Sequence, residues 1–289
     1  MKPFRLLTHL CAVVILVLFA TSASAQVAWN HDPASDIGPN FWGSLSFPFA
    51  ACGSQFDPVT NVLDGFVQVG LKQSPVDIVV ASTIPTALPA LTFQYNPTPF
   101  IIENTGHVVE VPYEAGSFLR VGQDTYQLLQ FHLHAPSEHA INGVLADAEL
   151  HLVHRNALLD LAVVGVMIKA GGPVNRLLDQ ILLNAPLDCP GVPPCEVELV
   201  GDINATEVLP PSQGYYNYSG SLTTPPCSEG VRWFVLKDPV FVTQRAITRF
   251  HQIIGRFPTY QPPINFRVWN DNNRPVRPLN GRAIWNQIP

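Results

Sequence analysis

The chain has 289 residues, of which 16 are Lys or Arg and 22 are Asp or Glu, so its formal net charge at pH 7 is −6. This charge offers no basic footprint, and we expect no nucleic-acid partner. Charged residues make up only 13% of the chain and there are 28 prolines. Together with many short runs of Val, Ile and Phe, this composition indicates a predominantly β, loop-rich protein.

The N-terminal residues 1–25 have the pattern of a secretory signal peptide. A basic start precedes an apolar run over residues 6–20, and Ala23-Ser24-Ala25 supplies a small-x-small cleavage motif. An uncleaved membrane anchor is the alternative, but the run is shorter than the about 20 residues that span a bilayer. We therefore expect cleavage before Gln26 and an exported protein, periplasmic or secreted, with no membrane segment after cleavage.

The mature chain, residues 26–289, is predicted to form one domain. It contains no linker, repeat or charged tail, and its candidate site residues are far apart in the sequence. A single core therefore has to bring them together, in a monomer or a homodimer.

Four cysteines remain in the mature chain: Cys52, Cys189, Cys195 and Cys227. Export places them in an oxidising compartment, where disulfides form. Four cysteines allow three pairings, which the sequence alone does not settle. Cys189 and Cys195 flank a proline-stiffened loop whose ends could close locally.

Two stretches place histidines on one strand face each. Gln130-Phe131-His132-Leu133-His134 and Glu149-Leu150-His151-Leu152-Val153 alternate as β-strands do, so side chains two residues apart share a face. If the strands pair, His132, His134 and His151 converge on one point. A lone strand histidine is usually a hydrogen-bonded core residue, but three imidazoles without a fourth protein ligand are typical of a catalytic zinc with an open position. The sequence therefore predicts one Zn²⁺ per chain.

The same alternation excludes other side chains from this site. Leu129, Phe131 and Leu133 should point to the opposite face of their strand. His154 should do so too, because it lies an odd number of positions after the third ligand. His139 follows a turn-like segment, and we interpret it as structural.

Polar partners for the ligands are predicted on the same two faces. Gln130 and Glu149 each precede a ligand by two residues, and metal-bound histidines commonly donate their second N–H to an amide or a carboxylate. We expect both side chains to hold ligand rings, since a buried glutamate needs a partner. Val153 lies beside the third ligand and gives this face an apolar member.

These histidine stretches resemble the alpha-class carbonic anhydrases, and further blocks match the family in order. Ordered blocks over nearly the whole mature chain are far more specific than a single His-x-His pair. The resemblance implies a single domain with a large central twisted mixed β-sheet and short peripheral helices. The further blocks are Gln73-Ser74-Pro75-Val76-Asp77-Ile78, Asn104-Thr105-Gly106-His107, Ser137-Glu138-His139, residues 218–226 and residues 273–279.

The resemblance also implies a reaction: zinc-dependent, reversible hydration of carbon dioxide to bicarbonate and a proton, with zinc-bound hydroxide attacking the carbon. Neutral imidazole ligands leave the zinc charge intact, and in carbonic anhydrases themselves the zinc-bound water has a pKa of about 7. Carbon dioxide and bicarbonate are the implied small-molecule partners. A non-catalytic binding module on the same fold and a zinc esterase are the alternatives.

Catalytic roles follow from the resemblance as well. Glu138 is expected to accept the hydroxyl proton of Thr223, so that this hydroxyl must accept from the zinc-bound hydroxide and orient it. Thr224 is expected to supply a further polar contact for water or bicarbonate. His107 occupies the position of the family's proton shuttle, a task that suits a side chain titrating near neutrality.

An apolar wall is expected to receive carbon dioxide, which is uncharged and has no net dipole. The resemblance adds four residues to Val153 in this wall: Val163, Leu222, Val231 and Trp233.

A disulfide pairing is implied in the same way. Extracellular members of the family carry a bridge between positions similar to Cys52 and Cys227, which would brace the loop that contains Thr223. Cys189 would then pair with Cys195.

Several positions depart from the family pattern. His31 stands where we expect a tyrosine near the active-site waters, and Thr105 and Glu110 replace polar amides that often line the proton route. The segment from Ser54 to Lys72 is longer than we expect. We expect these changes to affect proton transfer and the rim of the site, and to leave the zinc chemistry intact.

Overall fold

A computed structural model describes residues 27–53, 70–189, 193–257 and 270–288. The predicted signal peptide, residues 1–25, lies outside the described residues, and so does most of the long segment from Ser54 to Lys72. Cleavage before Gln26 and the domain boundary there therefore stay predictions.

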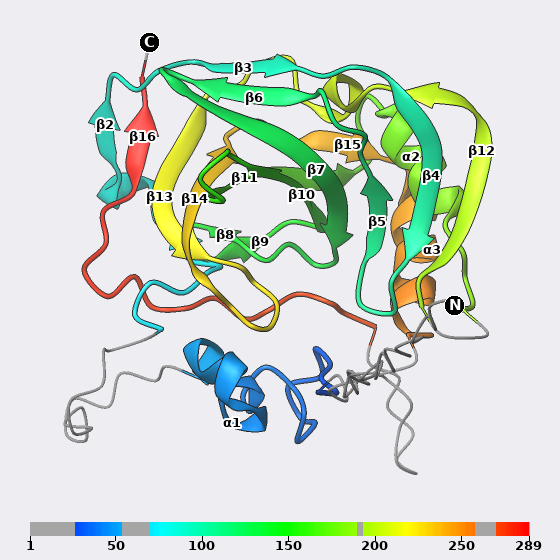
Figure 1. Ribbon diagram of the computed structural model, residues 1–289, viewed down its shortest axis with the longest axis horizontal. Helices are drawn as coiled ribbons and strands as arrows, with labels where there is room; N and C mark the ends of the chain where they lie inside the picture. The colour runs from blue at the N-terminus through cyan, green and yellow to red at the C-terminus, as the bar shows by residue number, and fades with distance from the viewer. Residues whose placement is uncertain (1–26, 54–69, 190–192, 258–269, 289) are drawn as a thin grey trace, which may run out of the picture.

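A large mixed sheet of 13 strands organises the described part of the chain (Figure 1). Most neighbours are antiparallel, whereas β11 is parallel to β14 and to β15, and β16 is parallel to β2. The predicted predominantly β architecture with a central mixed sheet is confirmed. The strands follow one another across the sheet in the order β12 (Cys195–Ile203), β4 (Thr98–Asn104), β5 (Val109–Pro112), β7 (Asp124–His134), β10 (Ala148–Arg155), β11 (Leu161–Ala170), β14 (Glu229–Leu236), β13 (Tyr215–Ser221), β16 (Trp285–Gln287) and β2 (Ile84–Thr86).

Shorter elements complete the fold. Beside the main path, β15 (Val240–Val242) pairs with β11, while β6 (Phe118–Val121) pairs with both β3 (Leu91–Gln94) and β7. A small second sheet contains β1 (Asp77–Ile78), β8 (Ala140–Ile141) and β9 (Val144–Leu145). The helices are α1 (Trp42–Leu45), α2 (Arg176–Asn184) and α3 (Gln244–Ile254), with 3₁₀ turns η1 (Phe47–Gly53), η2 (Val80–Ser82) and η3 (Ala205–Val208).

The two longer helices cover one face of the sheet and form the main core. Their N-caps are Asn175 and Thr243, whose side chains accept hydrogen bonds from backbone N–H groups of the first turn. Their apolar sides pack with strand residues such as Phe131, Leu150 and Phe234 in one buried cluster. None of the helices in the described ranges is long and apolar enough to cross a membrane.

The opposite face of β10, β11 and β14 carries a second, smaller cluster that includes Val163, Trp233 and Val235. Successive strand residues point to opposite faces, so the alternation predicted from the sequence separates the two clusters. The histidine face of β7 and β10 belongs to this second side. His154 faces the main core as predicted: it is fully buried and its Nε2 lies 2.6 Å from the hydroxyl of Tyr95.

One facing prediction is wrong. A β-bulge shifts the register between β7 and β10, so that Val153 is opposite Gln130 but His154 is opposite Leu128. Leu129 is the extra residue and has no partner on β10; it is only half-buried, and Leu128 takes its place in the main core. An inserted residue reverses the facing of everything beyond it, which strict alternation cannot predict.

Candidate metal centre

Three histidines converge where β7 and β10 pair. The strands are antiparallel with His132 directly opposite His151 and His134 opposite Glu149. The ring centroids of His132 and His134 are 5.0 Å apart, and those two rings lie 5.3 and 4.9 Å from the ring of His151. One nitrogen from each ring lies within 4.8 Å of the other two.

Two of the rings are held by the side chains predicted to hold them. His132 Nδ1 lies 2.8 Å from Gln130 Oε1, and His151 Nε2 lies 2.9 Å from Glu149 Oε1. Both oxygens accept, so each imidazole donates one N–H outward. Nε2 of His132 and Nδ1 of His151 then carry the lone pairs that face the centre of the triad.

The third ring is held by a residue that sequence reasoning missed. His134 Nδ1 lies 2.7 Å from the backbone oxygen of Asn272, leaving Nε2 as its acceptor nitrogen. The Asn272 side chain secures this loop, accepting from the Ala135 N–H and donating to the carbonyls of His107 and Leu133. His134 is fully buried, yet its Nε2 has no hydrogen-bond partner. Three lone-pair nitrogens, one of them buried and unpaired, fit a tetrahedral divalent cation with one open position.

Glu149 does more than hold one ligand. Its Oε1 also lies 2.7 Å from His139 Nδ1, and its Oε2 accepts from the backbone N–H groups of Glu138 and His139, at 2.9 and 2.8 Å. Burial alone would raise the pKa of this carboxyl, but His139 and His151 hold it well below its usual range. His139 is therefore structural, as predicted: its Nε2 lies 2.7 Å from the hydroxyl of Tyr218.

Gly165 on β11 makes room for this carboxylate. It lies directly opposite His151, and a Cβ built on it would lie 2.8 Å from Glu149 Oε1. Glu149 cannot move away cheaply, because both of its oxygens are hydrogen-bonded. A glycine inside the apolar strand over residues 161–170 is a sequence signal for such a close approach, and it was missed.

Glu138 lies at the edge of the triad and is fully buried. Its Oε1 accepts from the backbone N–H of Arg274 at 2.8 Å. Its Oε2 lies 3.6 Å from His134 Nε2 and 3.7 Å from His151 Nδ1, and it has no hydrogen-bond partner. The hydrogen bond expected from Thr223 is thus not formed in this structure, because the free oxygen faces the two imidazoles instead.

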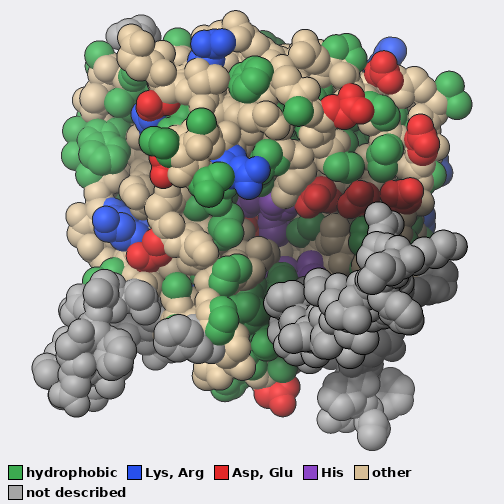
Figure 2. All heavy atoms as spheres, in the orientation of Figure 1, with side chains coloured by type: hydrophobic (Ala, Val, Ile, Leu, Met, Phe, Trp, Pro, Cys, Tyr) green, Lys and Arg blue, Asp and Glu red, His purple; other side chains and the backbone are tan. Residues whose placement is uncertain are grey.

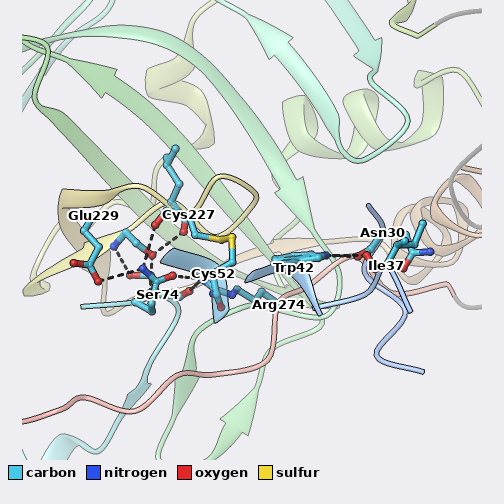
Figure 3. Close-up of a disulfide and its surroundings, with 11 residues drawn as sticks. Asn30, Ile37, Trp42, Cys52, Ser74, Cys227, Glu229 and Arg274 are labelled. Atoms are coloured by element: carbon cyan, nitrogen blue, oxygen red, sulfur yellow. Dashed lines mark hydrogen bonds between the residues drawn. A yellow bond between two sulfur atoms is a disulfide. The ribbon is translucent and has the colours of Figure 1, made fainter. Parts of the chain in front are cut away.

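Thr223 and Thr224 lie in the connection between β13 and β14, which also contains Cys227, one half of a disulfide (Figure 3). The structure contains the Cys52–Cys227 bridge and also the Cys189–Cys195 bridge. The Cys227 carbonyl accepts from the Gln73 side chain at 3.1 Å. The Cys52–Cys227 bridge joins η1 to the connection that contains Thr223.

The guanidinium of Arg274 is the second anchor of this region (Figure 3). It is almost fully buried and donates to the carbonyls of Cys52 and Ser74, at 3.0 and 2.7 Å, and to the Gln73 side chain at 2.9 Å. Its cation lies 5.7 Å from the ring centre of Trp42. The backbone N–H of Arg274 donates to Glu138. Arg274 therefore connects the disulfide region to the edge of the triad.

His107 stacks on Trp29, with ring centroids 3.8 Å apart and planes inclined by 6°. Burial lowers the pKa of His107 to about 4 in this position. Thr105 builds the turn that presents it, because the Thr105 hydroxyl accepts from the N–H groups of His107 and Val108. His31 is buried close by, with its ring 6.2 Å from that of His134, and burial, followed by His134, holds its pKa well below the usual range.

The residues predicted for an apolar wall all belong to the second hydrophobic cluster. Val163, Val231 and Trp233 are buried members, and Val153 and Leu222 pack against them. The Trp233 ring lies 4.8 Å from the ring of His151. The cluster therefore reaches the triad. Figure 2 shows histidine side chains in a hollow of the surface.

Comparison with known families agrees with this geometry. Residues 66–288 match the family model described as eukaryotic-type carbonic anhydrase. The chain belongs to the alpha-class carbonic anhydrases. Hydration of carbon dioxide is the reaction that this family implies.

Individual carbonic anhydrases are similar over nearly the whole chain. The chain is 38% identical to a carbonic anhydrase of Nostoc sp. over 91% of its length and 88% of the relative's. It is 35% identical to the enzyme of Neisseria gonorrhoeae, with 97% of each protein covered. Among solved structures, the alpha-carbonic anhydrase of Thermovibrio ammonificans in complex with sulfanilamide superposes with a TM-score of 0.75 at 32% identity, covering 90% of this chain and 99% of that one.

Within this carbonic anhydrase fold, Thr105 and Glu110, the two departures from the family's polar amides on the proton route, have different surroundings. Thr105 acts in the turn that carries His107, whereas Glu110 on β5 lies directly opposite His132. Burial, followed by repulsion from Glu103, raises the pKa of Glu110 to about 7. A carboxylate thus stands beside a ligand of the candidate metal centre.

Proposed function

We propose that this protein is an exported, zinc-dependent carbonic anhydrase that reversibly hydrates carbon dioxide to bicarbonate and a proton. The observation that carries the proposal is the convergence of His132, His134 and His151, each with its second nitrogen engaged by a hydrogen-bonding partner. Zinc held by three neutral imidazoles lowers the pKa of a coordinated water to about 7, as established for carbonic anhydrase itself, and so supplies a nucleophile at neutral pH.

The protein's own residues would orient the reactants. Glu138 Oε2 is buried and has no hydrogen-bond partner, so it is available to accept the Thr223 hydroxyl proton. Thr223 can then only accept a hydrogen bond from the attacking group, and this contact would fix the direction of that group's lone pair. Thr224 adds a polar contact for bicarbonate. The wall formed by Val153, Val163, Leu222, Val231 and Trp233 would hold uncharged carbon dioxide and exclude water.

His107 would carry the released proton to solvent. In its stacked position its pKa of about 4 is too low for efficient exchange at neutral pH. We propose that the ring leaves Trp29 and moves into water when it accepts a proton. Hydration then returns its pKa toward the ordinary value near 6.5.

Export is part of the proposal. Residues 1–25 have the composition of a signal peptide, and two disulfides suit an oxidising compartment. The mass of the protein recovered from the periplasm or medium should match a chain beginning at Gln26.

Stopped-flow hydration of carbon dioxide tests the function. Removal of zinc should abolish activity and its return should restore it, and His134→Ala should lose both zinc and hydration. His154→Gln is the matched control, because it alters a buried histidine on the other face of β10. Full zinc occupancy in His134→Ala would refute the ligand assignment. A zinc-loaded protein without hydration activity would instead favour a binding module or an esterase.

A further inference from the structure

Three glutamates occupy directly opposed positions on neighbouring strands. Glu196 of β12 is opposite Glu103 of β4, Glu103 is opposite Glu110 of β5, and Glu110 is opposite His132 of β7. Directly paired residues carry their side chains on the same face. The glutamates therefore form one row, the glutamate row, that ends at a metal-site histidine. Figure 2 shows acidic side chains over these strands, beside the hollow that contains the histidines.

This arrangement opposes folding stability. Like charges directly opposite each other in a sheet are destabilising, and no ion pair with the row exists among the described residues. Burial increases inward, from exposed Glu196 to half-buried Glu103 and Glu110. Burial raises the pKa of Glu103, and Glu196 raises it further. A locally unfavourable feature beside a functional site is where a functional reason is expected.

The row is not itself a metal site. Among the described residues, the groups of His, Cys, Asp and Glu whose ligand atoms approach within 4.8 Å contain no member of the row. Atoms able to bind a cation lie instead at the inner end of the row. Both His134 Nε2 and Glu138 Oε2 are buried there without hydrogen-bond partners. Because neighbouring strands are about 4.8 Å apart, the backbone positions of Glu110, Glu103 and Glu196 lie roughly 5, 10 and 14 Å from that of His132.

We propose that Glu196, Glu103 and Glu110 guide Zn²⁺ across the neighbouring strands β12, β4 and β5 to the histidine triad and so speed metal uptake. This guide presupposes the zinc ion proposed above. Negative charge lining a cleft raises the local concentration of cations and their association rates. A divalent ion feels each carboxylate twice as strongly as a monovalent one. The row acts over its full length only at low salt, since the Debye length falls from about 30 Å at 0.01 M to about 3 Å at 1 M.

The test measures zinc uptake by the full mature protein after its metal is removed with a chelator. Zn²⁺ alone is mixed with the apoprotein at pH 8, and its association rate is followed by loss of signal from a fluorescent zinc indicator. The triple variant Glu196→Gln, Glu103→Gln and Glu110→Gln should take up zinc roughly tenfold more slowly than wild type at ~0.01 M salt. The difference should shrink to less than about twofold near 1 M.

A matched control separates the row from net charge. The control variant Asp36→Asn, Glu114→Gln and Asp238→Asn removes the same number of negative charges, three, at exposed positions outside the row. It should bind zinc at the wild-type rate. Thermal unfolding of the apoproteins checks folding, because loss of like-charge repulsion should leave the row variant at least as stable as wild type. Wild-type uptake by the row variant at low salt, or equal slowing in the control, overturns the guide.

Zinc uptake does not depend on catalysis, so the two proposals can fail separately. A protein that shows row-dependent uptake but hydrates no carbon dioxide would keep the guide and overturn the proposed reaction. A protein that hydrates carbon dioxide, but whose row variant binds zinc as fast as wild type, would overturn the guide alone.

Discussion

Replacing Glu149 by glutamine should damage both stability and the metal centre. The carboxylate accepts four hydrogen bonds: Oε1 from His139 and His151, and Oε2 from the backbone N–H groups of Glu138 and His139. A carboxylate offers about four acceptor sites, so its capacity is used completely. Glutamine keeps one oxygen and places a donating NH₂ group at the other. In either orientation, two buried N–H groups face a donor.

The cost follows from these contacts. A buried donor left unpaired costs about 1–3 kcal/mol, and the two bonds that remain lose the assistance of a full charge. We therefore expect Glu149→Gln to lower the free energy of unfolding of the apoprotein by roughly 3–6 kcal/mol. Loss of the partner that orients a metal-binding histidine typically lowers metal affinity 10–100-fold. Zinc affinity should fall by this factor, because His151 either faces the NH₂ group or keeps only a neutral amide oxygen as its acceptor.

Two measurements on one preparation check this prediction. Urea unfolding of the apoprotein gives the stability change, and competition with a chelator gives the zinc dissociation constant. Gln130→Glu is the matched control, because it makes the reverse exchange beside His132 at a half-buried position and keeps an acceptor for Nδ1. It should change stability by less than about 1 kcal/mol. Unfolding of Glu149→Gln at the wild-type urea concentration, with unchanged zinc affinity, would refute the reasoning.

Three further predictions follow from individual contacts. Gly165→Ala places a methyl group 2.8 Å from Glu149 Oε1 and should cost about 1–3 kcal/mol in urea unfolding, with weaker zinc binding by competition; wild-type values for both would show that the space is not needed. His107→Ala should lower kcat about tenfold or more and leave kcat/KM nearly unchanged. Added imidazole should restore the rate, and a normal kcat in dilute buffer would exclude the shuttle role. Burial lowers the pKa of His154 to about 3, below the unfolded value near 6.5, so the unfolded chain binds the proton first and wild-type stability falls as the pH drops below 6.5. His154→Gln should remove roughly 3 kcal/mol of this loss at pH 4.5, measured by urea unfolding at pH 7 and 4.5, and an unchanged pH dependence would contradict the assignment.

The alternation of side chains made the ligand set predictable. His132, His134 and His151 lie on strands whose apolar residues mark the opposite face, and a period of two is local information. Leu129 shows the limit of that reasoning, since a single bulge moved it out of the core. Gln130 and Glu149 could be predicted for the same reason as the ligands: each is two residues from one of them. Their partners across the fold follow no such rule.

Asn272 illustrates what local patterns cannot reveal. It holds His134 through its backbone oxygen, and any residue type supplies that atom. Its side chain gave no independent signal, because the groups that it bonds lie more than 130 residues earlier in the sequence. Gly165 is the opposite case. A glycine within an apolar strand weakens the strand, so its presence calls for an explanation. The explanation is the carboxylate of Glu149, a residue that the strand pattern had already indicated.

One carboxylate also fixes the direction of a buried chain of hydrogen bonds. Glu149 can only accept, so His139 must donate from Nδ1, and its Nε2 is left to accept from the hydroxyl of Tyr218. The Tyr218 oxygen has then used its only proton, so the Ser74 hydroxyl, 2.8 Å away, must donate to it. The chain joins the segment after β7 to β10, β13 and the loop before β1. The direction is therefore set from Glu149 outward, and the hydroxyl hydrogens of Tyr218 and Ser74 each have one arrangement.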